Sequence, residues 1–164
     1  NHKPSLHNKT IAISLIKNTN RLEWFLEKAG EIGVSEIAPL ICDRTEKQRF
    51  RFERMQSILI SAMLQSQQTW LTKLHEPVKF ATFIKETTFQ QKFIAHCEDV
   101  PGKISLSLMS PFTNAAILIG PEGDFTKHEI EMGMENKFVP VSLGITRLRT
   151  ETAGLVAATL LCNS

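Results

Sequence analysis

Apolar residues form short runs that alternate with longer stretches of helical periodicity. Five runs rich in β-branched or other apolar residues predict strands, at residues 10–16, 36–41, 92–97, 115–119 and 138–143. The run at 115–119, Ala-Ala-Ile-Leu-Ile, has no polar position, so we expect that strand to be covered on both faces. A further segment, 78–84, fits either a short strand or the start of a helix.

Two helices are predicted in the first half of the chain. The first has its apolar positions on one face at helical spacing, at Leu22, Phe25, Leu26 and Ala29. We expect it to be capped by Asn20, with Glu23 three residues later, and to end at Gly33. The second is expected from Phe52, with one face formed by Met55, Leu59, Ala62 and Ser66.

Two more helices are predicted near the end of the chain. Thr126 and Glu129 have the spacing of a capping box for a helix over 127–135. A last helix, 153–161, is almost wholly apolar and is therefore expected to be buried, with Thr150 or Thr152 as its cap. Because strands alternate with helices, the sequence predicts the α/β class, with a mainly parallel sheet and helices on both faces.

Composition excludes few function classes. The net charge of +2 is too small to indicate a nucleic-acid partner, and no apolar run approaches the ~20 residues that span a bilayer. Three cysteines, Cys42, Cys97 and Cys162, lie far apart without a Cys-x-x-Cys pair. That argues against a disulfide framework or a zinc site, and for a reducing, cytoplasmic setting. Since no apolar run is long enough to span a bilayer, we expect no membrane partner.

The first nine residues are polar, and the chain begins without a methionine. We expect residues 1–9 to be a linker or the tail of a preceding domain. Residues 10–164 are then expected to form one domain.

A Gly-Pro-Glu-Gly loop, residues 120–123, follows the apolar run at 115–119. Glycines let a backbone turn sharply and approach a ligand, and open α/β sheets bind ligands beyond the carboxyl ends of their strands. The loop therefore predicts one wall of a ligand site, although a plain tight turn also fits. Neither phosphate-loop nor Gly-x-Gly-x-x-Gly spacing is present.

A second loop, residues 143–149, is the expected opposite wall. It carries Arg147 and Arg149 just before the apolar last helix. Arg149 either pairs with Glu151 or Glu122 in a structural role, or holds a phosphate or carboxylate with two hydrogen bonds.

The sequences of these two loops together resemble the signature of a known family. Gly-Pro-Glu-Gly-x-Phe at 120–125, followed by Leu-Gly-x-x-x-Leu-Arg-x-Glu-Thr-Ala at 143–153, resembles the signature of the ribosomal small subunit RNA methyltransferase E family. Its members are SPOUT-class enzymes that use S-adenosylmethionine to methylate N3 of a uridine in 16S rRNA. The match covers roughly residues 11–158. It departs from the family at Asp124, where many relatives have a second glycine, and at Gln67-Gln68, where an arginine usually follows the Gln-Ser pair.

The resemblance implies a C-terminal trefoil knot, a homodimer formed through the knot region, and an N-terminal PUA-like RNA-binding domain that is almost entirely absent here. It also implies that S-adenosylmethionine is held mostly by backbone groups of three loops. Carried onto this sequence, the cofactor-binding residues are His96, Ile119, Gly120, Glu122, Gly123, Leu143, Gly144, Ile145, Arg147 and Leu148.

The basic segment, residues 43–54, is the expected RNA contact on 16S rRNA or the small ribosomal subunit. RNA-binding residues are predicted at Arg44, Arg49, Arg51 and Gln65. Cations on such a segment release counterions when they meet phosphates. A solvated, partly ion-paired surface is the alternative.

The implied chemistry predicts two catalytic residues, Arg149 and Glu122. Because N3 of uracil must lose its proton, Arg149 would stabilise the developing anion. Glu122 or Glu151 would accept the proton, unless both carboxylates are structural. Two other classes stay open: an RNA-binding or assembly module without catalysis, and a nucleotide enzyme that uses residues 120–123 as a phosphate loop.

Overall fold

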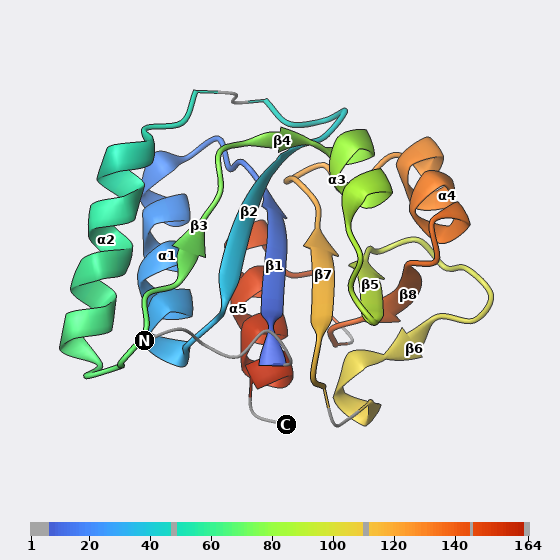
Figure 1. The fold of residues 1–164 in the computed structure, drawn as a ribbon. Coiled ribbons are helices and arrows are strands. Elements are labelled where there is room, and N and C mark those ends of the chain that lie inside the picture. The colour runs from blue at the N-terminus through green and yellow to red at the C-terminus, as the bar shows by residue number, and fades with distance from the viewer. Residues whose placement is uncertain (1–6, 47–48, 110–111, 145, 163–164) are drawn as a thin grey trace.

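The computed structural model describes residues 7–46, 49–109, 112–144 and 146–162. One sheet runs through the molecule, and Figure 1 shows helices on both of its faces. Strand order is β3-β2-β1-β7-β5-β8-β6, with β4 also pairing with β2, and every pairing is parallel. The predicted α/β class, with a mainly parallel sheet between helices, is therefore confirmed.

Regular elements occupy most of the described chain. The strands are β1 (Lys9–Ser14), β2 (Glu36–Ile41), β3 (Lys73–Leu74), β4 (Val78–Lys79), β5 (Gln91–Ala95), β6 (Ile104–Ser105), β7 (Ala115–Ile119) and β8 (Val139–Ser142). The helices are α1 (Thr19–Ile32), α2 (Phe52–Gln65), α3 (Phe80–Glu86), α4 (Lys127–Glu135) and α5 (Thr150–Cys162), with a short 3-10 turn, η2 (Leu106–Leu108).

The central strands are buried from both sides because successive side chains of a strand point to opposite faces. In β1, Ile11 and Ile13 belong to the core formed with α1, α2 and α5, whereas Ala12 belongs to the core formed with α3 and α4. Leu118 of β7 joins Ala12, and its neighbours in β7 face the other way. The prediction of a strand covered on both faces at 115–119 is confirmed.

The predicted helix starts were right at α4 and wrong at α1. Thr126 and Glu129 form the capping box of α4. At α1 the cap is Asn18, not Asn20, because the Asn18 side chain accepts hydrogen bonds from the backbone N–H of Asn20 and of Arg21, at 2.9 Å and 3.4 Å. α1 ends as predicted at Gly33, which has a left-handed φ of 94°.

Helix α5 begins at Thr150, three residues before the predicted 153, so neither Thr150 nor Thr152 precedes it as a cap. The Thr150 hydroxyl instead donates a hydrogen bond to the Gly120 carbonyl. Nor is α5 buried all round: Gly154 and Ala157 are buried, whereas Leu155 and Val156 are only partly so. α5 therefore leaves a partly apolar side uncovered.

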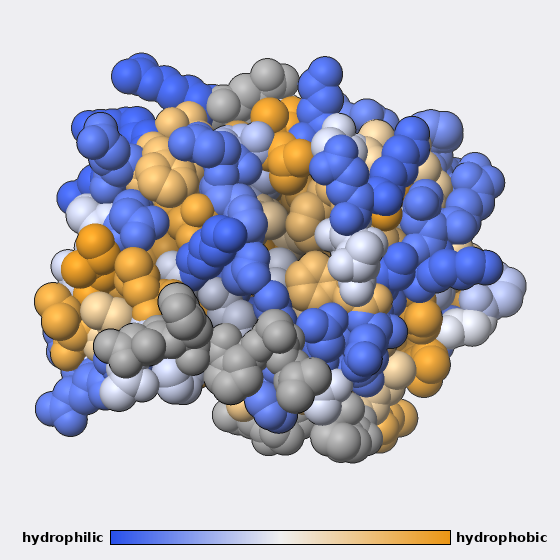
Figure 2. Space-filling model, in the orientation of Figure 1, coloured by the Kyte–Doolittle hydropathy of each residue, from blue (hydrophilic) through white to orange (hydrophobic). Residues whose placement is uncertain are grey.

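Apolar side chains also reach solvent on α2. Figure 2 shows apolar residues over α2, on which Ile60 and Leu64 are exposed, among mostly hydrophilic neighbours. Within the described ranges, no helix has the length and apolar character needed to cross a bilayer.

Segment 78–84, left open between strand and helix, contains both: β4 and the start of α3.

Candidate functional site

A cavity of about 350 Å³ opens at the carboxyl ends of β5, β7 and β8. Its walls come from the loops that follow these three strands, and from the start of α5. This volume suits a small organic ligand, and the carboxyl ends of a parallel sheet are where such ligands bind. The two loops predicted as walls of one site do border one cavity.

Most of the predicted cofactor residues meet here. Eight of the ten line the cavity: His96, Ile119, Gly120, Glu122, Leu143, Gly144, Arg147 and Leu148. Ile145 lies outside the described residues. Gly123 does not line the cavity, and its carbonyl accepts a hydrogen bond from Arg44 Nη1 at 2.6 Å. Residues 120–122 of the Gly-Pro-Glu-Gly loop thus line the cavity. The last residue of the loop, Gly123, contacts the basic segment instead.

The loop after β7 is tied to the start of α5 through Gly120. Thr150 Oγ1 donates a buried hydrogen bond to the Gly120 carbonyl at 2.9 Å. A Cβ at Gly120 would lie 3.1 Å from the backbone nitrogen of Phe125, tighter than nearly all such contacts. Gly120 therefore permits the close turn, and Thr150 fixes it against the last helix.

Asp124 is a site residue that the sequence identified only as a departure from glycine. It lines the cavity with a left-handed φ of 69°, a conformation that glycine adopts most easily. Its Oδ1 accepts the N–H of Phe125 at 2.8 Å, and its Oδ2 accepts the N–H of Cys97 at 2.9 Å. The carboxylate therefore joins the loop after β7 to the loop after β5.

Asp124→Gly is expected to leave the free energy of unfolding nearly unchanged. Relief of the left-handed conformation, about 1–2 kcal/mol, opposes the loss of the two hydrogen bonds that the carboxylate accepts, about 1 kcal/mol each. Affinity for S-adenosylmethionine, the predicted cofactor, is expected to fall about fivefold because the two loops are no longer joined. Calorimetry measures the cofactor affinity, and thermal melts measure the stability.

The matched control is Asp124→Asn, since asparagine tolerates left-handed φ and keeps an oxygen for the Cys97 N–H. Its cofactor affinity should stay close to that of the parent chain. Equal affinities for the Gly and Asn variants would contradict the bridging role.

His96 lines the cavity, but its ring nitrogens lie beneath the cavity surface. Its side chain is buried, and neither ring nitrogen has a hydrogen-bond partner among the described residues. Burial, followed by the positive charge of Lys103, lowers the pKa of His96. Lys103 Nζ also donates to the backbone carbonyls of His96 and Glu98, at 2.6 Å and 2.9 Å, which ties the loop after β5 together.

The lowered pKa of His96 predicts a pH dependence of stability. As the pH falls below about 6.5, the unfolded chain takes up a proton at His96 that the folded chain resists, so stability falls with it. We expect His96→Gln to flatten the loss of thermal stability between about pH 7 and pH 5. His128→Gln, at an exposed position of α4, is the control and should keep the parent slope. If the His96→Gln variant lost thermal stability with falling pH as steeply as the parent, the His96 ring would protonate freely in the folded chain.

The carboxylates that could have paired with Arg149 have other partners. Glu151 Oε2 lies 3.7 Å from Arg21 Nε, and Glu122 Oε2 accepts the backbone N–H of Lys17 at 2.9 Å. Arg149 is exposed and makes no ion pair with any residue in the described ranges. The structural pairing of Arg149 with Glu122 or Glu151 is therefore not formed.

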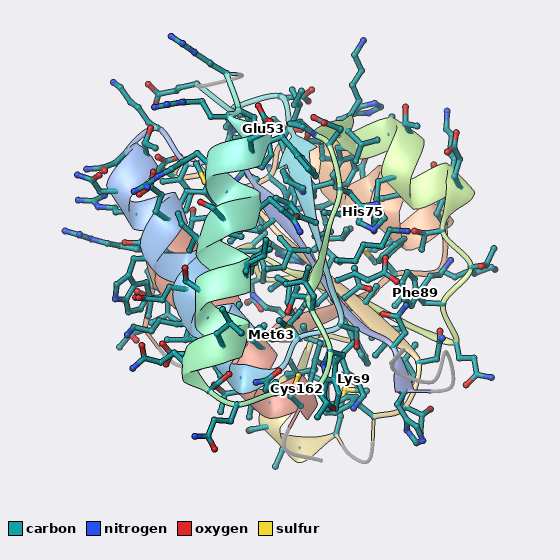
Figure 3. The ribbon with its side chains drawn as sticks, turned by 60° about the vertical axis from the view of Figure 1, so that its left-hand side comes forward. Lys9, Glu53, Met63, His75, Phe89 and Cys162 are labelled. Atoms are coloured by element: carbon teal, nitrogen blue, oxygen red, sulfur yellow. The ribbon has the colours of Figure 1, made fainter. Side chains whose placement is uncertain are left out.

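Of the predicted RNA contacts, three lie near the cavity end of the molecule and one does not. Arg44 contacts Gly123, and exposed Arg49 and Arg51 line a hollow beside the start of α1. Gln65 ends α2, about 20 Å along the helix from its start. Figure 3 shows that Met63, near that end, lies at the level of Lys9, where β1 begins. The structure does not bring Gln65 to the other three, because a helix separates them.

The described residues contain no group of three or more His, Cys, Asp or Glu side chains suited to a metal ion. Fold and site together define an α/β domain with a loop-built organic-ligand cavity at the carboxyl edge of its sheet. A model of the RNA methyltransferase domain family matches residues 3–162, and the chain belongs to that family. The resemblance to ribosomal RNA small subunit methyltransferase E proteins is thereby confirmed.

Similar proteins include two of known structure. A probable rRNA methyltransferase of Porphyromonas gingivalis is 40% identical, with a TM-score of 0.87, over 96% of this chain and 67% of its own. The ribosomal RNA small subunit methyltransferase E of Neisseria gonorrhoeae, bound to S-adenosyl methionine, is 29% identical, with a TM-score of 0.79, over 96% and 65%.

A curated relative shares the same name. The ribosomal RNA small subunit methyltransferase E of Synechocystis sp. is 31% identical over 90% of this chain and 50% of its own length. This chain therefore spans about half of that curated relative.

Proposed function

We propose that this chain is the cofactor-binding and catalytic domain of an S-adenosylmethionine-dependent methyltransferase that modifies N3 of a uridine in 16S rRNA of the small ribosomal subunit. The observation that carries the proposal is one cavity bordered by both family signatures, residues 120–125 and 143–153. A relative of the same architecture, from Neisseria gonorrhoeae, binds this cofactor.

The cavity wall fits S-adenosylmethionine. The three loops that hold the cofactor in the family resemblance all line the cavity, through His96, Gly120 and Leu143 among others. Thr150 and Asp124 fix the loops that carry His96 and Gly120. When bound, the cofactor supplies an electrophilic methyl group on a sulfonium. No metal is required for that step, because the sulfonium is already activated.

Two side chains serve the acceptor: Glu122, which lines the cavity, and Arg149, which lies just before α5. The Glu122 carboxylate accepts the N3 proton of uracil, and the electron pair of the broken N–H bond stays on N3. Arg149 stabilises the resulting anion through its guanidinium, which has no competing ion pair within the described ranges. N3 then bonds to the methyl carbon, and the pair of the broken carbon–sulfur bond leaves on sulfur. The base must be unstacked to reach these side chains.

The RNA and a second copy of the chain are the proposed partners. Arg44, Arg49 and Arg51 supply exposed cations on the cavity side of the molecule, where phosphates flanking the uridine would pass. A homodimer through a C-terminal knot would cover the partly exposed apolar residues of α5, Leu155 and Val156. The cytoplasm, where ribosomal RNA and the cofactor meet, is the proposed location.

The test uses the full-length protein. Calorimetry should detect S-adenosylmethionine binding but not ATP binding. Labelled methyl transfer to small subunits or naked 16S rRNA, followed by nucleoside mass spectrometry, should yield 3-methyluridine. Tighter binding of ATP would favour the phosphate-loop alternative. Cofactor binding without transfer to either RNA would favour the module without catalysis.

A further inference from the structure

Gly123 is the residue of the Gly-Pro-Glu-Gly loop that the cavity does not explain. Its neighbours Glu122 and Asp124 line the cavity, whereas Gly123 does not. Nor does its backbone require a glycine, because its φ is not left-handed, as that of Gly33 is. A Cβ at Gly123 would lie 3.3 Å from Cδ of Arg44, a distance shorter than nine in ten such contacts. The glycine therefore leaves room for the close approach of the Arg44 side chain.

Arg44 contacts this loop with both parts of its side chain. Its aliphatic Cδ lies against Gly123, and its Nη1 donates a hydrogen bond to the Gly123 carbonyl at 2.6 Å. A hydrogen bond from a charged donor is stronger than one between neutral groups. Because a glycine has no side chain, its position can be fixed only through its backbone, and the guanidinium does this. An arginine that only met RNA phosphates would need neither contact.

The two neighbours of Gly123 are held from other directions. Glu122 Oε2 accepts the backbone N–H of Lys17, in the loop after β1, at 2.9 Å. Asp124 Oδ2 accepts the N–H of Cys97, in the loop after β5, also at 2.9 Å. Three consecutive residues are thus held by three different loops, and the middle hold comes from the loop after β2. Losing it frees the residue between two that line the cavity.

The backbone that carries Arg44 is anchored on both sides. The N–H of Asp43 donates to Glu129 Oε2 of α4 at 2.8 Å. The buried Thr45 donates its N–H to the Cys42 carbonyl at 3.1 Å, and its Oγ1 accepts the Cys42 N–H at 2.8 Å. The exposed Arg44 side chain therefore extends from a fixed point, so no further backbone has to be ordered for it to reach the loop after β7.

We propose that Arg44 is a positioning residue for S-adenosylmethionine. It fixes Gly123, and with it the cavity-lining residues on either side, in the geometry that binds the cofactor. Arg44 does not itself line the cavity, so it acts through the loop. This inference rests on the proposed function and adds to it a physical link between the basic segment and the cofactor cavity.

The test compares Arg44→Ala, Gly123→Ala and the double variant of the full-length protein by calorimetry with S-adenosylmethionine. We expect Arg44→Ala to weaken cofactor binding about fivefold, the effect of losing one hydrogen bond of this kind. Gly123→Ala should weaken it by a similar or smaller factor, because the new methyl group crowds Arg44 Cδ. In the double variant the methyl group meets no arginine, so the affinity should equal that of Arg44→Ala alone. Arg44→Lys keeps a donor for the carbonyl and should recover part of the loss.

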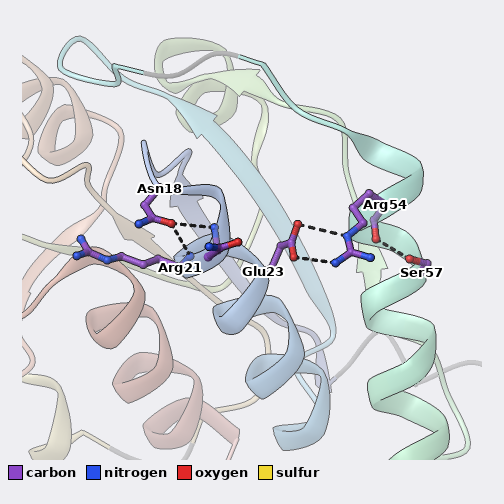
Figure 4. A network of polar contacts seen from close by, with 6 residues as sticks. Asn18, Arg21, Glu23, Arg54 and Ser57 are labelled. Carbon is purple, nitrogen blue, oxygen red and sulfur yellow. Dashed lines mark hydrogen bonds and ion pairs between the residues drawn. The ribbon is translucent and has the colours of Figure 1, made fainter.

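Arg54→Ala is the matched control. Arg54 also lies in the basic segment and also donates hydrogen bonds through its guanidinium, but to Glu23 of α1 (Figure 4), at 3.0 Å and 3.3 Å. Its loss removes the same charge from the segment and should leave the cofactor affinity unchanged.

Thermal melts of each variant show which ones are folded at the temperature of the measurement. If the parent protein neither binds the cofactor nor transfers methyl groups, the proposed function fails. If the parent binds the cofactor and folded Arg44→Ala binds it equally well, the positioning role is wrong. Losses that multiply in the double variant would also overturn it, because Arg44 and Gly123 would then act independently. So would an equal loss in Arg54→Ala, since the effect would then come from charge alone.

Discussion

Arg149→Ala is expected to slow methyl transfer by about 100- to 1,000-fold, the usual cost of removing one group that stabilises a developing anion. Affinity for S-adenosylmethionine should change little, because Arg149 does not line the cavity. Folding should also be spared. The arginine stands just before α5, where the positive end of the helix dipole does not favour a cation. Single-turnover transfer and calorimetry on the full-length protein separate these effects.

Two further variants define what Arg149 does. Arg149→Lys keeps the charge but loses the planar fork, so transfer should recover only in part. Arg147→Ala is the contrasting variant, because Arg147 lines the cavity and should affect cofactor affinity instead. If Arg149→Ala transfers methyl groups at the parent rate with cofactor affinity intact, the guanidinium has no part in the reaction.

Much of this fold could be predicted because its signals are local. The capping box of α4 needs only Thr126 and Glu129, which are three residues apart, and the left-handed end of α1 needs only Gly33. A continuous apolar run was enough to predict that β7 is buried on both faces. Short strands gave no such signal: β3, β4 and β6 have two residues each, too few to show a period.

The sequence predicted which loops form the site, but not the contacts between them. The family signatures identified residues 120–125 and 143–153, and these do border one cavity. The bridge from Asp124 to Cys97 joins residues 27 positions apart, and sequence spacing carries no information about it. Burial of His96 was equally hidden, because it depends on how the loop after β5 packs in three dimensions. Sequence resemblance also grouped Gln65 with Arg44, although the length of α2 keeps them apart.

The tight packing of α5 against β1 and α1 predicts a large loss of stability for Gly154→Ala. A Cβ at Gly154 would lie 2.6 Å from Phe25 Cε1 and 2.9 Å from Ile13 Cδ1, and both side chains are fully buried. Overpacking of this kind costs about 1–3 kcal/mol, and the helix propensity gained by alanine, up to about 1 kcal/mol, offsets only part of it. We expect the thermal midpoint to fall by several degrees, roughly 2–4 °C per kcal/mol at this chain length.

Gly133→Ala is the matched control, since Gly133 is also helical and its nearest neighbour, Ile94 Cδ1, lies at an ordinary 3.4 Å. That variant should be as stable as the parent, or slightly more so. Any shift of α5 also moves Thr150, whose hydroxyl holds the Gly120 carbonyl at the cavity. Gly154→Ala should therefore weaken S-adenosylmethionine binding as well as folding, whereas Gly133→Ala should affect neither. A Gly154→Ala midpoint equal to that of the Gly133 variant would mean that α5 does not approach β1 this closely.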